Sequence, residues 1–202
     1  MSYKGITRYE TDMSQKKDKR IVKSEEAILE AGIKLLLNNR SASMLEIANA
    51  AGIGRATLYR HFQSREALVK RLAFSCDKEF NAAFIPYSNL GGRAAIEKVF
   101  DIAMPMADRF NFLIRLWSLV EDDEEVLQIK AQTQRDMEFL FKQARKNGDI
   151  DKSLPDAWLM AFFDNILAAG WELIEAGKAD ADTAANLAKR SFFSGCSVTE
   201  QR

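Results

Sequence analysis

Histidine, cysteine and proline are scarce in this chain of 202 residues, and each scarcity removes a kind of chemistry. The one histidine, His61, cannot supply the clustered imidazoles of a typical metal site. The two cysteines, Cys76 and Cys196, form no C-x-x-C pair, so we expect neither a disulfide framework nor a zinc site. Because proline interrupts helices, only three prolines leave most of the chain free to be helical.

Signatures of catalysis are also missing. The chain has no glycine-rich phosphate loop and no nucleophile elbow. The acidic run from Glu121 to Glu125 could bind a hard divalent cation, but a solvated helix N-terminus explains it more simply. We therefore expect a protein that is not an enzyme and that holds no cofactor and no metal.

Charge is balanced overall but unevenly distributed. With 29 basic and 29 acidic residues the net charge is zero, which argues against a nonspecific nucleic-acid coat. Residues 1–80 hold 15 basic and 10 acidic residues, whereas residues 81–202 hold 14 and 19, giving nets of +5 and −5. No signal peptide or confident membrane span is recognisable, so we expect a cytoplasmic protein with no membrane partner.

The segment 43–68, SMLEIANAAGIGRATLYRHFQSREAL, predicts two short helices around a tight turn. Ser43 and Glu46 have the spacing of a capping box, in which side chains satisfy the free amides of a helix start. Gly52 allows the sharp turn, and Gly54 can cap the second helix weakly. This is the organisation of a helix-turn-helix unit.

The second of these helices carries more hydrogen-bond donors than packing requires. Ile53, Leu58 and Phe62 can turn inward, which leaves the polar positions facing outward. Donors on a projecting helix suit the phosphates and base edges of a DNA major groove. The candidate DNA-binding residues are Ser43, Arg55, Ala56, Thr57, Tyr59, Arg60, His61 and Arg65.

The run AGIGRATLYRHFQSREAL, with the preceding KSEEAILEAGIKLLLNN, resembles the DNA-binding segment of the tetracycline-repressor (TetR) family of bacterial transcriptional regulators. The resemblance covers roughly residues 20–75 and implies an all-α homodimer with two N-terminal DNA-binding heads. It also implies that Ser43, Tyr59, His61 and Arg65 contact phosphates and that Arg55, Ala56 and Thr57 face bases. Gly54 departs from the family, which often has serine there.

The remaining sequence predicts helices and little else. A segment of about 155–176 is apolar nearly all the way round, which indicates burial on more than one side, and a second helix follows at about 181–194. A partner helix explains the doubled apolar surface, and the resemblance likewise implies a four-helix dimer interface. The candidate interface residues are Trp158, Phe162, Trp171, Leu187 and Phe192.

Aromatic and methionine side chains are concentrated in the middle helices. Ordinary core packing accounts for such a pattern, but the resemblance implies a ligand enclosed among these helices, here a small hydrophobic or aromatic effector. The candidate pocket residues are Met104, Phe110, Asn111, Arg115, Trp117, Phe139, Phe162 and Asn165.

These patterns divide the chain into three parts. Residues 1–22 form a basic N-terminal arm, either a disordered tail or a segment that follows the DNA backbone, and Met13 offers an alternative start. Residues 23–70 form a three-helix DNA-binding head, and residues 71–202 form a helical effector-binding and dimerisation domain.

The sequence thus predicts a repressor that binds a palindromic operator in double-stranded DNA as a homodimer and is released by a largely apolar effector. A DNA-binding dimer without an effector is the alternative. A helical enzyme or metal-binding protein is a third and much weaker one.

Overall fold

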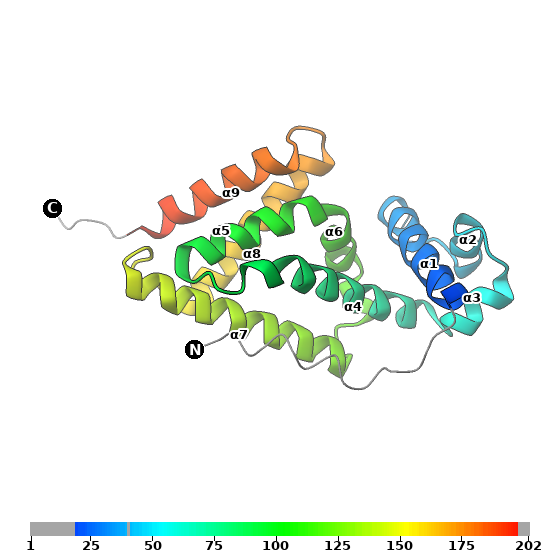
Figure 1. Ribbon diagram of the computed structural model, residues 1–202. Helices are drawn as coiled ribbons and strands as arrows, with labels where there is room; N and C mark the ends of the chain where they lie inside the picture. Colours follow the sequence, from blue (N-terminus) through cyan, green and yellow to red (C-terminus); the bar gives the residue numbers. More distant parts are fainter. Residues whose placement is uncertain (1–18, 40, 198–202) are drawn as a thin grey trace. The chain divides into compact units, whose positions relative to one another are not determined.

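The computed structural model describes residues 19–39 and 41–197, apart from the side chains of residues 19–24, 111–115 and 117. This part of the chain contains helices and no strand, which confirms the predicted all-α fold (Figure 1). The α-helices are α1 (Lys19–Asn38), α2 (Met44–Ala50), α3 (Arg55–His61), α4 (Arg65–Phe84), α5 (Gly92–Ala103), α6 (Ala107–Leu116), α7 (Glu124–Asn147), α8 (Asp156–Glu175) and α9 (Ala181–Cys196). Short 3₁₀ turns follow three of them: η1 (Ile85–Tyr87), η2 (Met104–Met106) and η3 (Trp117–Leu119).

The described residues group into two compact units. The head unit contains residues 19–78 and 108–126, and the body unit contains residues 79–107 and 127–197. Helix α4 belongs to both, because its first fourteen residues (65–78) lie in the head unit and the rest in the body unit. The sequence placed residues 108–126 in the C-terminal domain, whereas the structure groups them with the head.

The head unit has one hydrophobic core. Residues of α1, α2, α3 and α4 meet there, and three side chains from the segment 108–126 complete it. Those three side chains are Leu116, Val120 and Val126. Segment 108–126 therefore contributes side chains to the hydrophobic core of the head unit.

Helix α1 begins at Lys19, so residues 19–22 are helical rather than part of the predicted arm. Helix α2 begins with the predicted capping box. The Glu46 carboxylate accepts hydrogen bonds from the Ser43 amide (2.7 Å) and hydroxyl (2.8 Å), and the Ser43 oxygen accepts from the Glu46 amide (3.2 Å). The backbone and side-chain hydrogen bonds from Ser43 lower the pKa of Glu46 below its ordinary value.

The body unit encloses an aromatic core. Phe100 of α5 packs against Phe163 of α8 (ring centroids 4.7 Å apart) and against Phe192 of α9 (5.8 Å). Phe141 of α7 reaches the same cluster, with its ring 6.0 Å from that of Phe192. The Trp171 indole is buried and donates a 3.0 Å hydrogen bond to the Ala103 carbonyl. Four helices are thus fixed to one another by rings.

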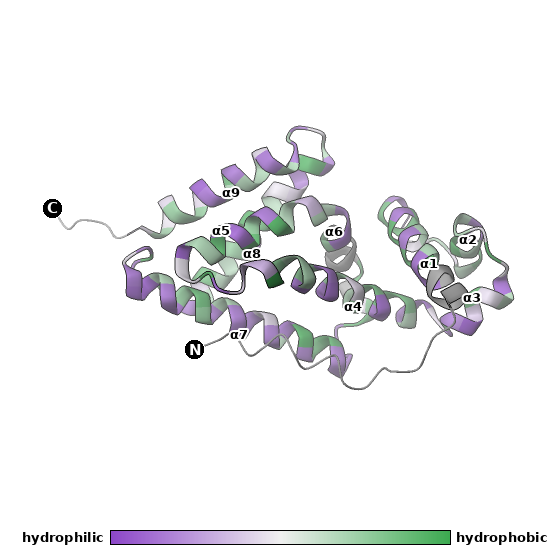
Figure 2. Ribbon diagram, viewed as in Figure 1, coloured by the Kyte–Doolittle hydropathy of each residue, from purple (hydrophilic) through white to green (hydrophobic). Residues whose placement is uncertain are grey.

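Helix α8 is rich in hydrophobic residues, whereas hydrophilic and hydrophobic residues alternate along α7 in Figure 2. It alone among the described helices is long and apolar enough to cross a bilayer by length and composition, a test that core helices also pass. Only 28% of its most apolar window is buried within the chain. Burial within its own chain therefore does not explain why α8 is so rich in apolar residues.

Replacing Ser43 with alanine should lower the free energy of unfolding of the head by about 1 kcal/mol, because α2 loses its N-cap. Thermal and denaturant unfolding followed by circular dichroism measure this. Ser41→Ala is the matched control, since the Ser41 hydroxyl is exposed and caps no helix. Equal losses in the two variants would contradict the capping role.

Candidate nucleic-acid interface

Helix α3 presents one buried side and one exposed side. Leu58 is fully buried and Phe62 nearly so, and Ile53 packs against the same core, as the sequence predicted. The other side is exposed or partly exposed, and its members are Arg55, Ala56, Thr57, Tyr59, Arg60 and His61. The core thus fixes α3 by one side and leaves its donors to solvent.

Two contacts organise the exposed side of α3. The Arg60 guanidinium donates a 3.1 Å hydrogen bond to the Thr57 hydroxyl. The Arg55 guanidinium lies 5.4 Å from the centre of the Tyr59 ring, a cation–π distance. Because the Thr57 oxygen accepts from Arg60, its own hydrogen stays available to a base or phosphate acceptor. The side chains are therefore partly ordered before any ligand arrives.

The turn before α3 follows from two glycines. Gly52 has a φ of 67°, a left-handed conformation that favours glycine. Gly54 is the N-cap of α3, and no side chain caps the helix there, as expected for a residue without one. A side-chain carbon at Gly54 would meet no neighbour within 4 Å, so the space in front of α3 is open.

Three predicted phosphate contacts also have structural roles within the head. The Ser43 hydroxyl is engaged by Glu46 in the capping box. Arg65 is partly buried and donates a 3.0 Å hydrogen bond to the Ala42 carbonyl, which ties the start of α4 to the loop before α2. His61 is partly buried with its ring 6.2 Å from that of Phe62. Replacing these residues would therefore disturb the head as well as any DNA contact.

Sequence reasoning did not find the ion pairs that hold segment 108–126 to the head. Lys70 of α4 contacts the carboxylates of Asp123 (2.9 Å) and Glu125 (2.6 Å), and these two hydrogen-bonded partners raise the pKa of Lys70. Arg109 of α6 contacts Glu30 of α1 at 2.6 Å. The acidic run that could have been a cation site thus faces an ammonium group. In the sequence, the acidic run 121–125 was the only sign of these ion pairs, and it did not identify Lys70 as their basic partner.

The described candidate effector residues differ in their exposure. Met104 is fully buried in the body core, and Phe139 is 48% exposed on α7. Asn165 is exposed, and its amide donates a 2.7 Å hydrogen bond to the Ala161 carbonyl. Phe162 is partly buried, as is Phe110 in the head unit. The side chains of Asn111, Arg115 and Trp117 lie outside the described part.

The candidate dimer residues fall into two groups. Trp171 and Phe192 are buried in the core of their own chain, so the prediction that they reach a partner needs correction. Trp158 is 57% exposed and stacks on Phe162, with ring centroids 6.4 Å apart. Leu187 is partly exposed on α9. The accessible part of the predicted interface is therefore Trp158, Phe162 and Leu187.

Helix α3 is short and rich in hydrogen-bond donors, it follows a glycine turn, and it packs on a helical core. This arrangement defines a helix-turn-helix DNA-binding protein. Comparison with known proteins agrees: residues 28–72 match the family model for bacterial regulatory proteins of the tetR family. The chain is 25% identical over 157 residues to the HTH-type transcriptional repressor LfrR of Mycolicibacterium smegmatis, covering 77% of this chain and 81% of LfrR.

Solved structures share the fold of most of the chain. The crystal structure of LfrR from Mycobacterium smegmatis in complex with proflavine has a TM-score of 0.68 and 24% identity, covering 88% of this chain and 99% of that one. KstR2, a ketosteroid transcriptional regulator of Mycobacterium tuberculosis, has a TM-score of 0.69 and 14% identity, with coverages of 87% and 95%. The N-terminal segment thus matches the TetR family model, and the fold of most of the chain is shared with solved TetR-like transcriptional regulators.

The exposed residues of α3 separate into two predicted classes. Tyr59→Phe should weaken binding to all DNA sequences alike, since a phosphate contact carries little sequence information. Arg55→Gln should change the preferred sequence, with a loss of about 1–3 kcal/mol at one base position. Selection from a randomised DNA pool, followed by titration of single-base variants, measures both.

Lys78→Gln is the matched control for Arg55→Gln, because it removes the same charge from an exposed site on α4. If Lys78→Gln and Arg55→Gln shift the preferred sequence equally, the assignment of Arg55 to a base is wrong.

Proposed function

We propose that this chain is a TetR-family repressor that binds a two-fold symmetric operator as a homodimer and releases it when a small, largely apolar effector binds. The observation that carries the DNA-binding part is the exposed, partly ordered donor face of α3. Regulation at an operator requires access to chromosomal DNA, so we infer a location in the bacterial cytoplasm. Two heads on one operator read successive major grooves, which a single head cannot do.

Support for the homodimer comes from the outer surface of α8. Trp158 leaves more than half of its surface in solvent, and most of the apolar window of α8 is unburied in the single chain. Large exposed apolar surface is typical of an interaction site. Helix α9 runs beside α8, and Gly195 permits the close approach of Phe162, since a side-chain carbon there would lie 2.9 Å from its ring. Two such helix pairs can form a four-helix interface.

Support for an aromatic effector comes from the relatives and from the composition of the body unit. The LfrR structure with a similar fold holds proflavine, a flat aromatic molecule. In this chain Phe139, whose ring is 48% exposed, is the described effector candidate with the most accessible aromatic surface. Asn165 is the described polar candidate that could orient a ligand, although its amide already donates to a backbone carbonyl.

The coupling between effector and DNA requires a physical link, and segment 108–126 provides one. It belongs to the head unit by packing but is joined at both ends to body residues, at 107 and at 127. A change in the body that shifts either junction must therefore strain the head core or move it. An effector that prefers the shifted conformation would lower DNA affinity by linkage.

Trp158→Glu should shift the protein from dimer to monomer, because a charge would be buried at the proposed interface. Sedimentation velocity at micromolar concentration measures the shift. Ile85→Glu is the matched control, since Ile85 is also half exposed but lies on η1 of the body unit, outside the proposed interface. A dimer unaffected by Trp158→Glu would contradict the proposed interface.

Proflavine should bind the protein and weaken its operator binding by at least about tenfold, the effect of roughly 1.4 kcal/mol of coupling. Fluorescence of proflavine measures its binding, and fluorescence anisotropy of labelled operator measures release. Because proflavine also binds DNA, an unrelated DNA-binding protein on its own site is the control. Tight proflavine binding without operator release would favour a regulator that has no effector of this kind.

A further inference from the structure

The 3₁₀ turn η2 joins α5 to α6 and lies against α8 and α9. Pro105, in the middle of the turn, has no backbone N–H, so the α-helical hydrogen-bond pattern of α5 is interrupted there. The head unit begins at residue 108, one residue after Ala107, the C-cap of η2. The turn is thus the last part of the body unit before the chain enters the head unit.

Trp171 of α8 stabilises the 3₁₀ form of this turn. In a continuous α-helix the Ala107 amide would donate to the Ala103 carbonyl, but in η2 it donates to the Met104 carbonyl. The indole Nε1 of Trp171 donates a 3.0 Å hydrogen bond to the Ala103 carbonyl instead, and both residues are buried. Because a buried carbonyl without a donor is costly, this hydrogen bond favours the 3₁₀ form over a regular helix.

Gly170, the neighbour of Trp171, makes room for the side chain of Met104. Met104 is fully buried, and a side-chain carbon at Gly170 would lie 2.5 Å from the Met104 Cε and 2.6 Å from its Sδ. The same carbon would lie 3.8 Å from the Cβ of Ala184 on α9. Glycine inside a helix is less favourable than alanine, so close packing against η2 is the reason we assign to glycine at this position.

The sequence of η2 favours a different backbone conformation from the one that these contacts hold. A residue that precedes proline prefers an extended backbone. Met104 precedes Pro105, yet its φ and ψ are helical, at −63° and −45°. The contacts with Gly170 and Trp171 therefore hold Met104 away from its local preference, and the turn has another conformation to adopt when they are lost.

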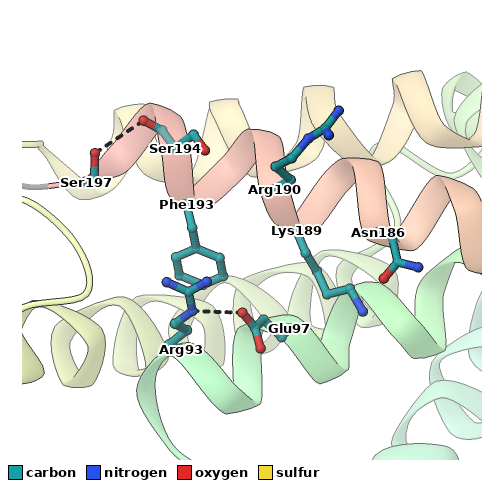
Figure 3. Close-up of a pocket in the computed structure, with 8 residues that line it drawn as sticks. All are labelled: Arg93, Glu97, Asn186, Lys189, Arg190, Phe193, Ser194 and Ser197. Carbon is teal, nitrogen blue, oxygen red and sulfur yellow. Dashed lines mark hydrogen bonds and ion pairs between the residues drawn. The ribbon is translucent and has the colours of Figure 1, made fainter.

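Helix α5, in contrast, is fixed to α9 by contacts that do not involve η2. Figure 3 shows the Arg93 guanidinium of α5 lying against the Phe193 ring of α9, 4.4 Å from its centre. Lys189 of α9 pairs with Asp101 of α5 at 2.7 Å. A conformational change at η2 would therefore leave α5 in place and change how the chain continues beyond the turn.

We propose that Gly170 and Trp171 form a latch that holds η2 in its 3₁₀ form, and that movement of α8 releases η2 and weakens operator binding. The inference rests on the proposed repressor function and adds to it the residues through which a movement of α8 acts. A released η2 no longer fixes where segment 108–126 begins. The head must then be ordered as it binds DNA, which lowers the affinity.

The Trp171→Phe variant tests the latch, because phenylalanine keeps a buried ring and loses the indole N–H. In hydrogen exchange of the full chain measured by mass spectrometry, amides of residues 104–107 should exchange at least about fivefold faster than in the wild type. Amides of α7 should keep their wild-type rates. Tyr87→Phe is the matched control, since it removes one donor from an exposed aromatic side chain of the body unit. It should leave residues 104–107 within about twofold of the wild type.

The Gly170→Ala variant tests the same latch without removing a hydrogen bond. The added methyl group should displace Met104 and accelerate exchange at residues 104–107, as Trp171→Phe does. In a Met104→Ala background the space is free, so Gly170→Ala should add no further acceleration. An equal effect of Gly170→Ala in both backgrounds would contradict the packing role of Gly170.

Operator affinity tests the link between the latch and the head. By fluorescence anisotropy with DNA that the wild type selects from a randomised pool, Trp171→Phe should bind at least about fivefold more weakly and Tyr87→Phe within about twofold of the wild type. Sedimentation velocity should show equal fractions of dimer in all three proteins, because Trp171 is buried in its own chain.

Each failure has a distinct meaning. Unchanged exchange at residues 104–107 in Trp171→Phe, or equal acceleration throughout the body unit, would overturn the latch. Faster exchange there with unchanged DNA affinity would overturn its link to operator binding. If the wild type selected no DNA sequence, the proposed function would be wrong and the link with it, whereas the exchange rates would still show whether the latch exists.

Discussion

The burial of Leu116, Val120 and Val126 in the head core is the interaction on which the rest of the structure depends. Full burial of a side chain of this size contributes about 1.5–3 kcal/mol, so together these three resist separation of segment 108–126 from α1 and α4. The ion pairs Lys70–Asp123 and Arg109–Glu30 lie near the protein surface, where such pairs add little stability. These ion pairs instead determine orientation, because they fix how segment 108–126 lies on the head.

This shared core explains how the short helix α3 is held in a defined orientation. Seven residues of α3 cannot form a stable helix alone, so Leu58 and Phe62 must anchor them to the core that also contains segment 108–126. The burial of Leu58 and Phe62 therefore also fixes the positions of the exposed hydrogen-bond donors of α3.

The sequence predicted the local features well and the long-range ones poorly. The capping box of Ser43 and Glu46, the turn at Gly52 and the inward direction of Leu58 all depend on residues a few positions apart, and the structure contains each of them. The pairing of Lys70 with Asp123 joins residues far apart in the chain, which periodicity does not encode. Burial of Trp171 and Phe192 was misjudged for the same reason, since an apolar helix does not reveal which of its faces meets its own chain. Helix α1 begins at Lys19, four residues before the segment KSEEAILEAGIKLLLNN in which the sequence indicated the first helix.

Hydrogen exchange measured by mass spectrometry tests most directly whether segment 108–126 and the DNA-binding head form one cooperative unit. The Ile47→Val substitution removes one methyl group from the fully buried core of the head and should destabilise that unit. The account predicts that amides of α6 then exchange faster, in step with those of α1 and α4, while amides of α8 and α9 keep their wild-type rates. If α6 instead kept its wild-type rate while α1 and α4 accelerated, segment 108–126 would not be part of the head, and the proposed route from effector to DNA would be wrong.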